Sequence, residues 1–180
     1  MSLRSERYGR IRHCPGGSAS SPDISADGSR IYVNDNEGSL HAIDAATGRN
    51  IWKFFIGYGP GGSQSTSPEG LIMPAGGGGA PLMCIRDAGQ EARLMWKNDS
   101  LNHLGLPMQT SGHLAFATVA GSPTKAYKDL VVVDNRTGNV LDRVHFPGKT
   151  LFTVGTTIGA EGNVYVPGFD GTLFAFRPAE

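Results

Sequence analysis

Apolar and polar positions alternate over short stretches of this 180-residue chain, and the alternating stretches recur at a regular spacing. SLHAID, residues 39–44, has the pattern of a half-buried β-strand. Four such strands carry a leucine near their start, at Leu40, Leu82, Leu130 and Leu173, with gaps of 42, 48 and 43 residues. A second series agrees, in which a small polar start and a turn precede an apolar strand; it begins at Ser20, Thr66, Gln109 and Thr156. The chain is therefore predicted to consist of repeats.

Turn signals divide each repeat into short strands. Asp27-Gly28 is a strong hairpin signal because glycine tolerates a positive φ, and Asn36–Gly38 and Asp170-Gly171 have the same character. The glycine run at residues 76–79 is interpreted as a slack connection between the middle strands of the second repeat. Four short antiparallel strands every 40 to 50 residues or so are typical of a β-propeller blade. The nearest candidate for a helix, residues 88–99, is predicted to form a turn and an outer strand instead.

The predicted fold is all-β: one β-propeller module over residues 1–180, with about four blades of four antiparallel strands, as a partial ring or a small ring. The repeats span residues 17–60, 61–104, 105–152 and, incompletely, 153–180, after an N-terminal segment of residues 1–16. Tyr8–His13 is predicted to complete the last blade, or to be the outer strand of a preceding, absent blade. A fragment of a larger ring, a closed ring and a half-ring that pairs with a second copy all stay open, with the fragment favoured.

The composition excludes some classes of binding partner. Sixteen acids balance sixteen bases, so no field of one sign attracts nucleic acid or an anionic membrane. No apolar run approaches the length of a membrane span, and no apolar stretch follows the basic N-terminus as in a secretory signal. Cys14 and Cys84 are too few for a disulfide framework and are expected to be unpaired thiols, although pairing of the two stays open. The sequence leaves the compartment open.

One motif points to a family. The pattern Ala-x-Asp-x-x-Thr-Gly-x-x-x-Trp is matched in full by Ala42, Asp44, Thr47, Gly48 and Trp52. This stretch resembles the tryptophan-docking repeat of the quinoprotein-like family, the pyrroloquinoline-quinone-type propellers. The resemblance implies that the tryptophan lies flat between adjacent blades, against an alanine and a glycine peptide. An indole buries a large apolar face and needs a partner for its N–H, which supports a joint between blades rather than a platform for a cofactor.

The other repeats keep only parts of this motif. The second keeps Trp96 but has Arg86 in the place of the aspartate. The third keeps Asp134, Thr137 and Gly138, but Val132 replaces the alanine and Asp142 the tryptophan, and the fourth keeps Ala175. Only one complete joint is therefore expected.

Sites for chemistry are sparse. Quinone-dependent dehydrogenases of the resembled family hold calcium, a catalytic aspartate and a disulfide of adjacent cysteines, whereas the cysteines here are 70 residues apart. GYGPGG, residues 57–62, matches a dinucleotide fingerprint, but no helix is predicted to follow it. The histidines lack metal-site spacing, and His103 with His113 is only a weak metal pair. We expect no catalytic, cofactor-binding or metal residues; the alternative is a fragment of a dehydrogenase that uses pyrroloquinoline quinone and calcium.

The predicted function is non-catalytic: a protein-binding or scaffold and sensor module, with a protein, a peptide or a second copy as partner and neither nucleic acid binding nor membrane insertion. The resemblance implies a periplasmic or extracellular location. Three loops are predicted to form a ligand face, Gly57–Ser67, Leu101–Thr110 and Pro147–Thr156. Its candidate residues are Gly59, Gly61, Ser63, Ser65, His103, Gln109 and Thr156.

Overall fold

The computed structural model describes residues 16–120, 127–147 and 155–178, and in these ranges the chain forms strands and no helix. The first blade is an antiparallel sheet of four strands in chain order. Its strands are β1 (Asp23–Ile24), β2 (Arg30–Asn34), β3 (Ser39–Asp44) and β4 (Asn50–Phe55). The Asp27-Gly28 turn joins β1 to β2 as predicted, with Gly28 at φ 73°.

The second and third blades share one continuous sheet. The second blade has β5 (Ser65–Thr66), β6 (Leu71–Met73), β7 (Gly76–Asp87) and β8 (Ala92–Gly105). The third blade has β9 (Met108–Gln109), β10 (Leu114–Ala120), β11 (Tyr127–Asp134) and β12 (Val140–His145). β8 pairs with β7 along the outer edge of the second blade, and its far end pairs with β10 of the third through His103 and Val119. This single strand therefore links two blades.

The fourth blade has three described strands, β13 (Thr157–Ile158), β14 (Val164–Pro167) and β15 (Leu173–Phe176), paired in that order. The predicted all-β propeller class with antiparallel blades is confirmed, and the candidate helix at residues 88–99 is a turn followed by β8. The predicted strand Tyr8–His13 and Cys14 lie outside the described residues. The described residues contain no helix long and apolar enough to cross a membrane.

The glycine run at residues 76–79 was expected to be a slack connection, and this interpretation is wrong. β7 begins at Gly76, which pairs with Gly105 of β8. A Cβ at Gly76 would lie 2.7 Å from Cδ2 of His103, so the absence of a side chain allows close packing here. Glycine in a strand often marks such close approach.

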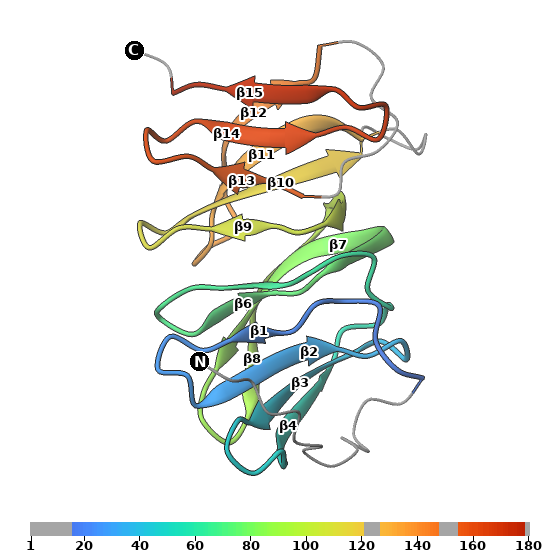
Figure 1. The fold of residues 1–180 in the computed structure, drawn as a ribbon, viewed down its shortest axis with the longest axis vertical. Helices are drawn as coiled ribbons and strands as arrows, with labels where there is room; N and C mark the ends of the chain where they lie inside the picture. The colour runs from blue at the N-terminus through green and yellow to red at the C-terminus, as the bar shows by residue number, and fades with distance from the viewer. Residues whose placement is uncertain (1–15, 121–126, 148–154, 179–180) are drawn as a thin grey trace, which may run out of the picture.

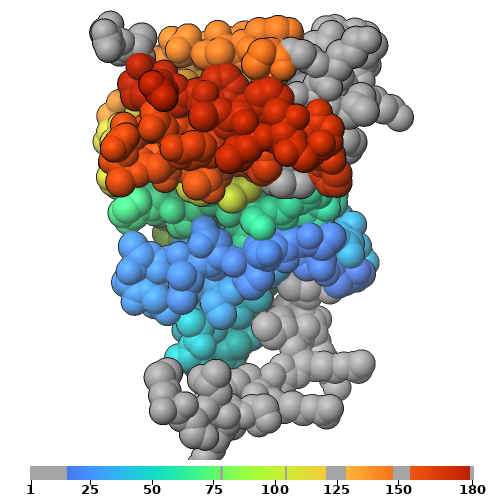
Figure 2. Space-filling model, turned by 45° about the horizontal axis from the view of Figure 1, so that its top comes forward, coloured from blue at the N-terminus to red at the C-terminus, as the bar shows by residue number. Residues whose placement is uncertain are grey.

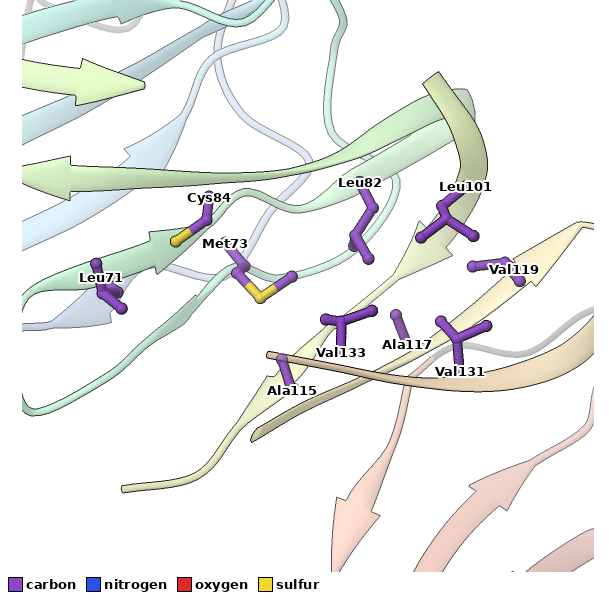
Figure 3. Close-up of a cluster of buried hydrophobic side chains, with 10 residues drawn as sticks. All are labelled: Leu71, Met73, Leu82, Cys84, Leu101, Ala115, Ala117, Val119, Val131 and Val133. Carbon is purple, nitrogen blue, oxygen red and sulfur yellow. The ribbon is translucent and has the colours of Figure 1, made fainter. Parts of the chain in front are cut away.

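The first blade lies at the opposite end of the molecule from the third and fourth (Figures 1 and 2). Buried apolar side chains fill the interface between each pair of consecutive blades. Between the second and third blades, leucines, Met73 and Cys84 point at the alanines and valines of β10 and β11 (Figure 3). Each buried aliphatic side chain contributes about 1.5–3 kcal/mol by leaving water. Alternate side chains along β6 and β7 thus serve two interfaces, one on each face of the second blade.

Candidate functional site

Trp52 lies at the joint between the first two blades. It stands on β4 opposite Ala42 of β3, is only 6% exposed, and packs in a cluster with Ile72 and Ile85 of the second blade. Its indole Nε1 donates a hydrogen bond of 3.2 Å to Oδ1 of Asp87. A small residue opposite the indole leaves room for it, and the polar edge of the ring finds a partner across the interface.

Asp87 binds several groups of this joint at once. It accepts hydrogen bonds from Nη1 of Arg30 at 2.7 Å and from the hydroxyl of Tyr32 at 2.6 Å, besides the indole of Trp52. Burial and the carboxylate of Asp87 raise the pKa of Tyr32, so the phenol stays protonated and remains a donor. Asp87 also accepts from the amide of Gly89 in its own turn at 2.9 Å.

Sequence reasoning missed Asp87 because the alignment of repeats puts Arg86 at the aspartate position of the motif. The acid stands one residue later, and its partners come from the preceding blade. The only sign of Asp87 in the sequence was that an acidic residue directly follows the mismatched Arg86.

Trp96 forms a second joint, so the expectation of only one complete joint is wrong. Its Nε1 donates to the carbonyl of Asn135 in the third blade at 2.8 Å. The ring covers Gly138 so closely that a Cβ there would lie 2.6 Å from its Cδ2 atom. The tryptophan of one blade meets the Asp-x-x-Thr-Gly turn of the next, and a mismatch within the second repeat therefore does not prevent this joint.

The turn of the first blade has the same chemistry as the turn under Trp96. Oδ1 of Asp44 accepts from the amides of Ala46 and Thr47 and from the Thr47 hydroxyl, as the motif predicts for an Asx-type turn. A Cβ at Gly48, however, would meet no described atom within 4 Å. Trp52 therefore does not cover Gly48 as Trp96 covers Gly138, and its indole is hydrogen-bonded to Asp87 of the second blade instead.

The third joint uses phenylalanines. Val132 and Asp142 occupy the alanine and tryptophan positions of the third blade and face each other across β11 and β12. Phe146 instead packs edge to face against Phe174 and Phe176 of the fourth blade, with ring centroids 5.1 and 5.4 Å apart. Edge-to-face rings stabilise one another beyond the area that they bury.

The loops predicted as a ligand face pack closely against each other. A Cβ at Gly62 would lie 2.4 Å from Cα of Gly105, and Leu106 forms a parallel bridge with Gly155. The amide of Gly61 donates to the carbonyl of Gly76 at 2.6 Å, and a Cβ at Gly77 would lie 2.3 Å from the carbonyl oxygen of Gly59. Glycine here permits backbone contact between blades. Of the loop Pro147–Thr156, residues 148–154 lie outside the described residues.

His103 is not a loop residue, because β8 extends to Gly105. It is 1% exposed, and its ring nitrogens lie 3.2 Å from the carbonyl oxygen of Ala80 and 3.3 Å from that of Pro74. Burial lowers the pKa of His103 to about 4, so the imidazole is neutral at pH 7. It is therefore buried inside the sheet and inaccessible to a ligand.

Two other candidates of this face bind the backbone of neighbouring strands. The side-chain amide of Gln109 donates to the carbonyls of Ser65 and Leu71, at 2.7 and 3.0 Å. The hydroxyl of Thr156 donates to the carbonyl of Phe116 at 3.4 Å. Ser65 is buried, whereas Ser63 is half-buried in the loop before β5. Gln109 and Thr156 thus hold blades together.

An open depression of about 350 Å³ lies between turns of the first two blades, and of those predicted loops only the end of Gly57–Ser67 contributes to its lining. Its lining includes Ser25, Asp27, Arg30, Ser67, Glu69 and Asp87. We call it the turn groove. Asp27 and Glu69 stand on equivalent turns, and their spacing of 42 residues equals the first gap of the leucine series. That spacing was the available signal for the groove, which sequence reasoning did not use.

The turn groove is anionic at neutral pH. Hydrogen bonds from the hydroxyl of Ser25 and from Ser29 lower the pKa of Asp27 to about 2, and a hydrogen bond from Ser67 lowers the pKa of Glu69. Arg30 is the one cation of the lining, and its guanidinium is paired with Asp87. The two turn carboxylates therefore give the groove a net negative charge, and both accept hydrogen bonds from serines.

The described residues give no support for a bound quinone with calcium. They contain no group of three or more histidine, cysteine, aspartate or glutamate side chains that could hold a metal ion. Trp52 and Trp96 are engaged at blade joints. Cys84 is buried, and burial raises the pKa of its thiol to about 12, which leaves it protonated and unreactive.

Comparisons with known proteins agree on the fold. A family model described as outer membrane protein assembly factor BamB matches residues 9–180. Protein Rv3035 of Mycobacterium tuberculosis is 30% identical over 164 residues, which cover 90% of this chain and 40% of that protein. This chain therefore spans less than half the length of that curated relative.

Two solved structures resemble the chain. BamB from Moraxella catarrhalis has a TM-score of 0.67 at 15% identity, covering 87% of this chain and 45% of its own. The β-propeller domain of Cps50 (Swd1) from Myceliophteria thermophila has a TM-score of 0.68 at 14% identity, covering 89% and 53%. At these identities the likeness shows the β-propeller fold alone.

Proposed function

This chain belongs to the family of the outer membrane protein assembly factor BamB, whose model matches residues 9–180, and from this membership we propose that it is a non-catalytic β-propeller module that binds other proteins. The outer membrane in the family's description supports a location outside the cytoplasm. The turn groove is the observation that carries the proposal, because it is an open polar site between two blades and is suited to a side chain of a partner.

The blade joints make the module a rigid support for this groove. Asp87 binds Arg30 and Tyr32 across the interface between the first two blades, and these residues also line the groove. The two turns that flank the groove are thereby fixed relative to each other. Rigid positioning lowers the entropic cost of binding a partner.

The charges that line the groove indicate which side chain of a partner it would bind. Asp27 and Glu69 are ionised at neutral pH, and the guanidinium of Arg30 is neutralised by Asp87. The groove therefore suits a lysine or arginine side chain of a protein partner. Hydroxyl groups of Ser25 and Ser67 in the lining offer further hydrogen bonds to a bound backbone.

The experiment compares short fluorescein-labelled glycine–serine peptides that carry lysine, norleucine or glutamate at one central position. Fluorescence polarisation gives the affinity for each. We expect the lysine peptide to bind about fivefold tighter than the norleucine peptide, since one exposed ion pair contributes roughly 1 kcal/mol. Glu69→Gln should reduce this preference, and added salt should weaken it.

Glu161→Gln is the matched control, because Glu161 is an exposed acid on the equivalent turn of the fourth blade, outside the groove. It should leave the preference unchanged. Equal affinity for the lysine and glutamate peptides would contradict the proposed binding site. Saturable binding of pyrroloquinoline quinone with calcium, accompanied by a rise in melting temperature, would contradict the non-catalytic assignment.

A further inference from the structure

His113 occupies a turn position that the other blades give to glycine. The turns between the first two strands of those blades place Gly28, Gly70 and Gly162 at φ 73°, 75° and 79°. His113 stands at the corresponding place of the third blade with a φ of 67°, and no other described residue except glycine has a positive φ. This backbone is unfavourable for a residue with a side chain. Strained positions of this kind concentrate at functional sites, so the imidazole is a candidate for a role beyond the turn.

The turn that carries His113, residues 110–114, lies beside the turn that carries Glu69, residues 67–71. Gln109 directly precedes the first turn, and its side-chain amide donates to the carbonyl of Leu71 at the end of the second, at 3.0 Å. The same amide donates to the carbonyl of Ser65 in β5 at 2.7 Å. These bonds hold the two turns next to each other on adjoining blades, so a charge on the imidazole lies close to the carboxylate of Glu69.

Glu69 lines the turn groove and also interacts with His113. A hydrogen bond from the hydroxyl of Ser67 and, to a smaller extent, the charge of His113 lower the pKa of Glu69. In the groove, this carboxylate is one of the two turn acids that attract a cation. The negative charge of Glu69 can therefore be offset by an imidazolium from within the chain or by a cationic side chain from a partner.

The other elements around His113 contribute few charged groups. The amide of Asn135 donates to the carbonyl of His113 at 2.9 Å, which places the turn of Asp134 and Arg136 against it. These two side chains form an ion pair of 2.7 Å, and the hydrogen bond from Arg136 lowers the pKa of Asp134 to about 2. β9 and β10 carry no charged side chain. Glu161, on the corresponding turn of the fourth blade, is the remaining acid to be tested.

We propose that His113 is a pH-dependent competitor for Glu69, whose imidazolium form offsets this carboxylate and weakens the binding of a cationic side chain in the turn groove. The inference rests on the function proposed for the groove and adds its regulation. Histidine gains its positive charge between about pH 8 and pH 5, so the groove should hold a lysine more tightly at pH 7.5 than at pH 5.5. Proton binding at His113 and cation binding in the groove oppose each other, each by the same factor.

The first experiment measures the affinities of the lysine and norleucine peptides for the whole chain at pH 7.5 and pH 5.5. Their ratio should fall from about fivefold to about twofold as the imidazolium forms. The turn carboxylates should stay ionised in this range, because the pKa values of both Asp27 and Glu69 are lowered. His113→Asn, which tolerates a left-handed backbone but does not titrate, should keep the ratio near fivefold at both pH values. His145→Gln, at an exposed histidine of β12 in the same blade, is the matched control and should behave as the unchanged chain does.

An NMR titration of the imidazole tests the inference without a peptide. A nearby carboxylate favours the charged form of an imidazole, so Glu69→Gln should move the midpoint of the His113 titration to lower pH by roughly half a unit. Glu161→Gln should leave the midpoint where it is. A midpoint that Glu161→Gln moves and Glu69→Gln does not would overturn the pairing of His113 with Glu69.

The peptide experiment separates the regulation from the function on which it rests. A lysine preference of the same size at both pH values, or one that still falls at pH 5.5 in His113→Asn, would overturn the regulation and leave the function of the groove intact. Equal affinity for the lysine and norleucine peptides at pH 7.5 would contradict the function of the groove, and the regulation would fall with it.

Discussion

Replacing Gly138 by alanine tests the joint between Trp96 and the third blade. Gly138 has a φ of 75°, and a Cβ would lie 2.6, 2.8 and 3.0 Å from three atoms of the indole. The left-handed backbone costs an alanine about 1–2 kcal/mol, and forcing a methyl group into a packed ring costs about 1–3 kcal/mol. The free energy of unfolding should therefore fall by about 2–5 kcal/mol.

Gly48→Ala is the matched comparison, because Gly48 occupies the same position of the first blade with a φ of 68° and no described atom within 4 Å of its Cβ. This variant should lose only the backbone part, about 1–2 kcal/mol. Urea unfolding followed by circular dichroism measures both, and the two midpoints should differ by roughly 0.5–1 M. Equal destabilisation by the two substitutions would refute the close contact between Trp96 and the turn.

Other predictions follow from buried polar groups. Asp87→Ala should lower the free energy of unfolding by about 3 kcal/mol, since it leaves Arg30 without its partner in a partly buried joint. Tyr32→Phe should lower it by only about 1 kcal/mol, because it removes a single hydrogen bond. Thermal unfolding measures both. Cys84 should not react with a thiol reagent such as dithionitrobenzoate until the protein unfolds, and fast labelling of the native protein would contradict its burial. The pKa of His103 is about 4 in the folded state against 6.5 in the reference state, so the unfolded chain binds the extra proton and stability should fall by about 3 kcal/mol as the pH drops from 6.5 to 4. His103→Gln should flatten the pH dependence in this window, and an unchanged slope would assign it to another group.

The sequence was sufficient for features that lie within one repeat. The leucine spacing, the Asp27-Gly28 hairpin and the strand pattern predicted the propeller class, because alternation and turn chemistry are local properties. Asp44 caps its own turn for the same reason, since its hydrogen-bond partners lie within three residues.

Features formed between repeats escaped prediction. Asp87 binds side chains from another blade, and the alignment gave it no assigned role. Trp96 was linked to the mismatched turn of its own repeat, although its partner is Gly138 of the next blade. His103 was assigned to a loop because β8 is longer than the outer strand of the first blade. In each case the missing knowledge was which segments are neighbours in space.

The strand β8 also bears on how the molecule comes apart. Its first part closes the second blade, and its end at His103 is hydrogen-bonded into the third blade. Neither blade can open fully without breaking pairs along this shared strand, so the two blades form one cooperative unit, while the first and fourth blades can detach separately. Native-state hydrogen exchange should therefore give the slowest amides in β7, β8, β10 and β11, with a common opening energy. A chain pulled from both ends would lose its outer blades before this central pair.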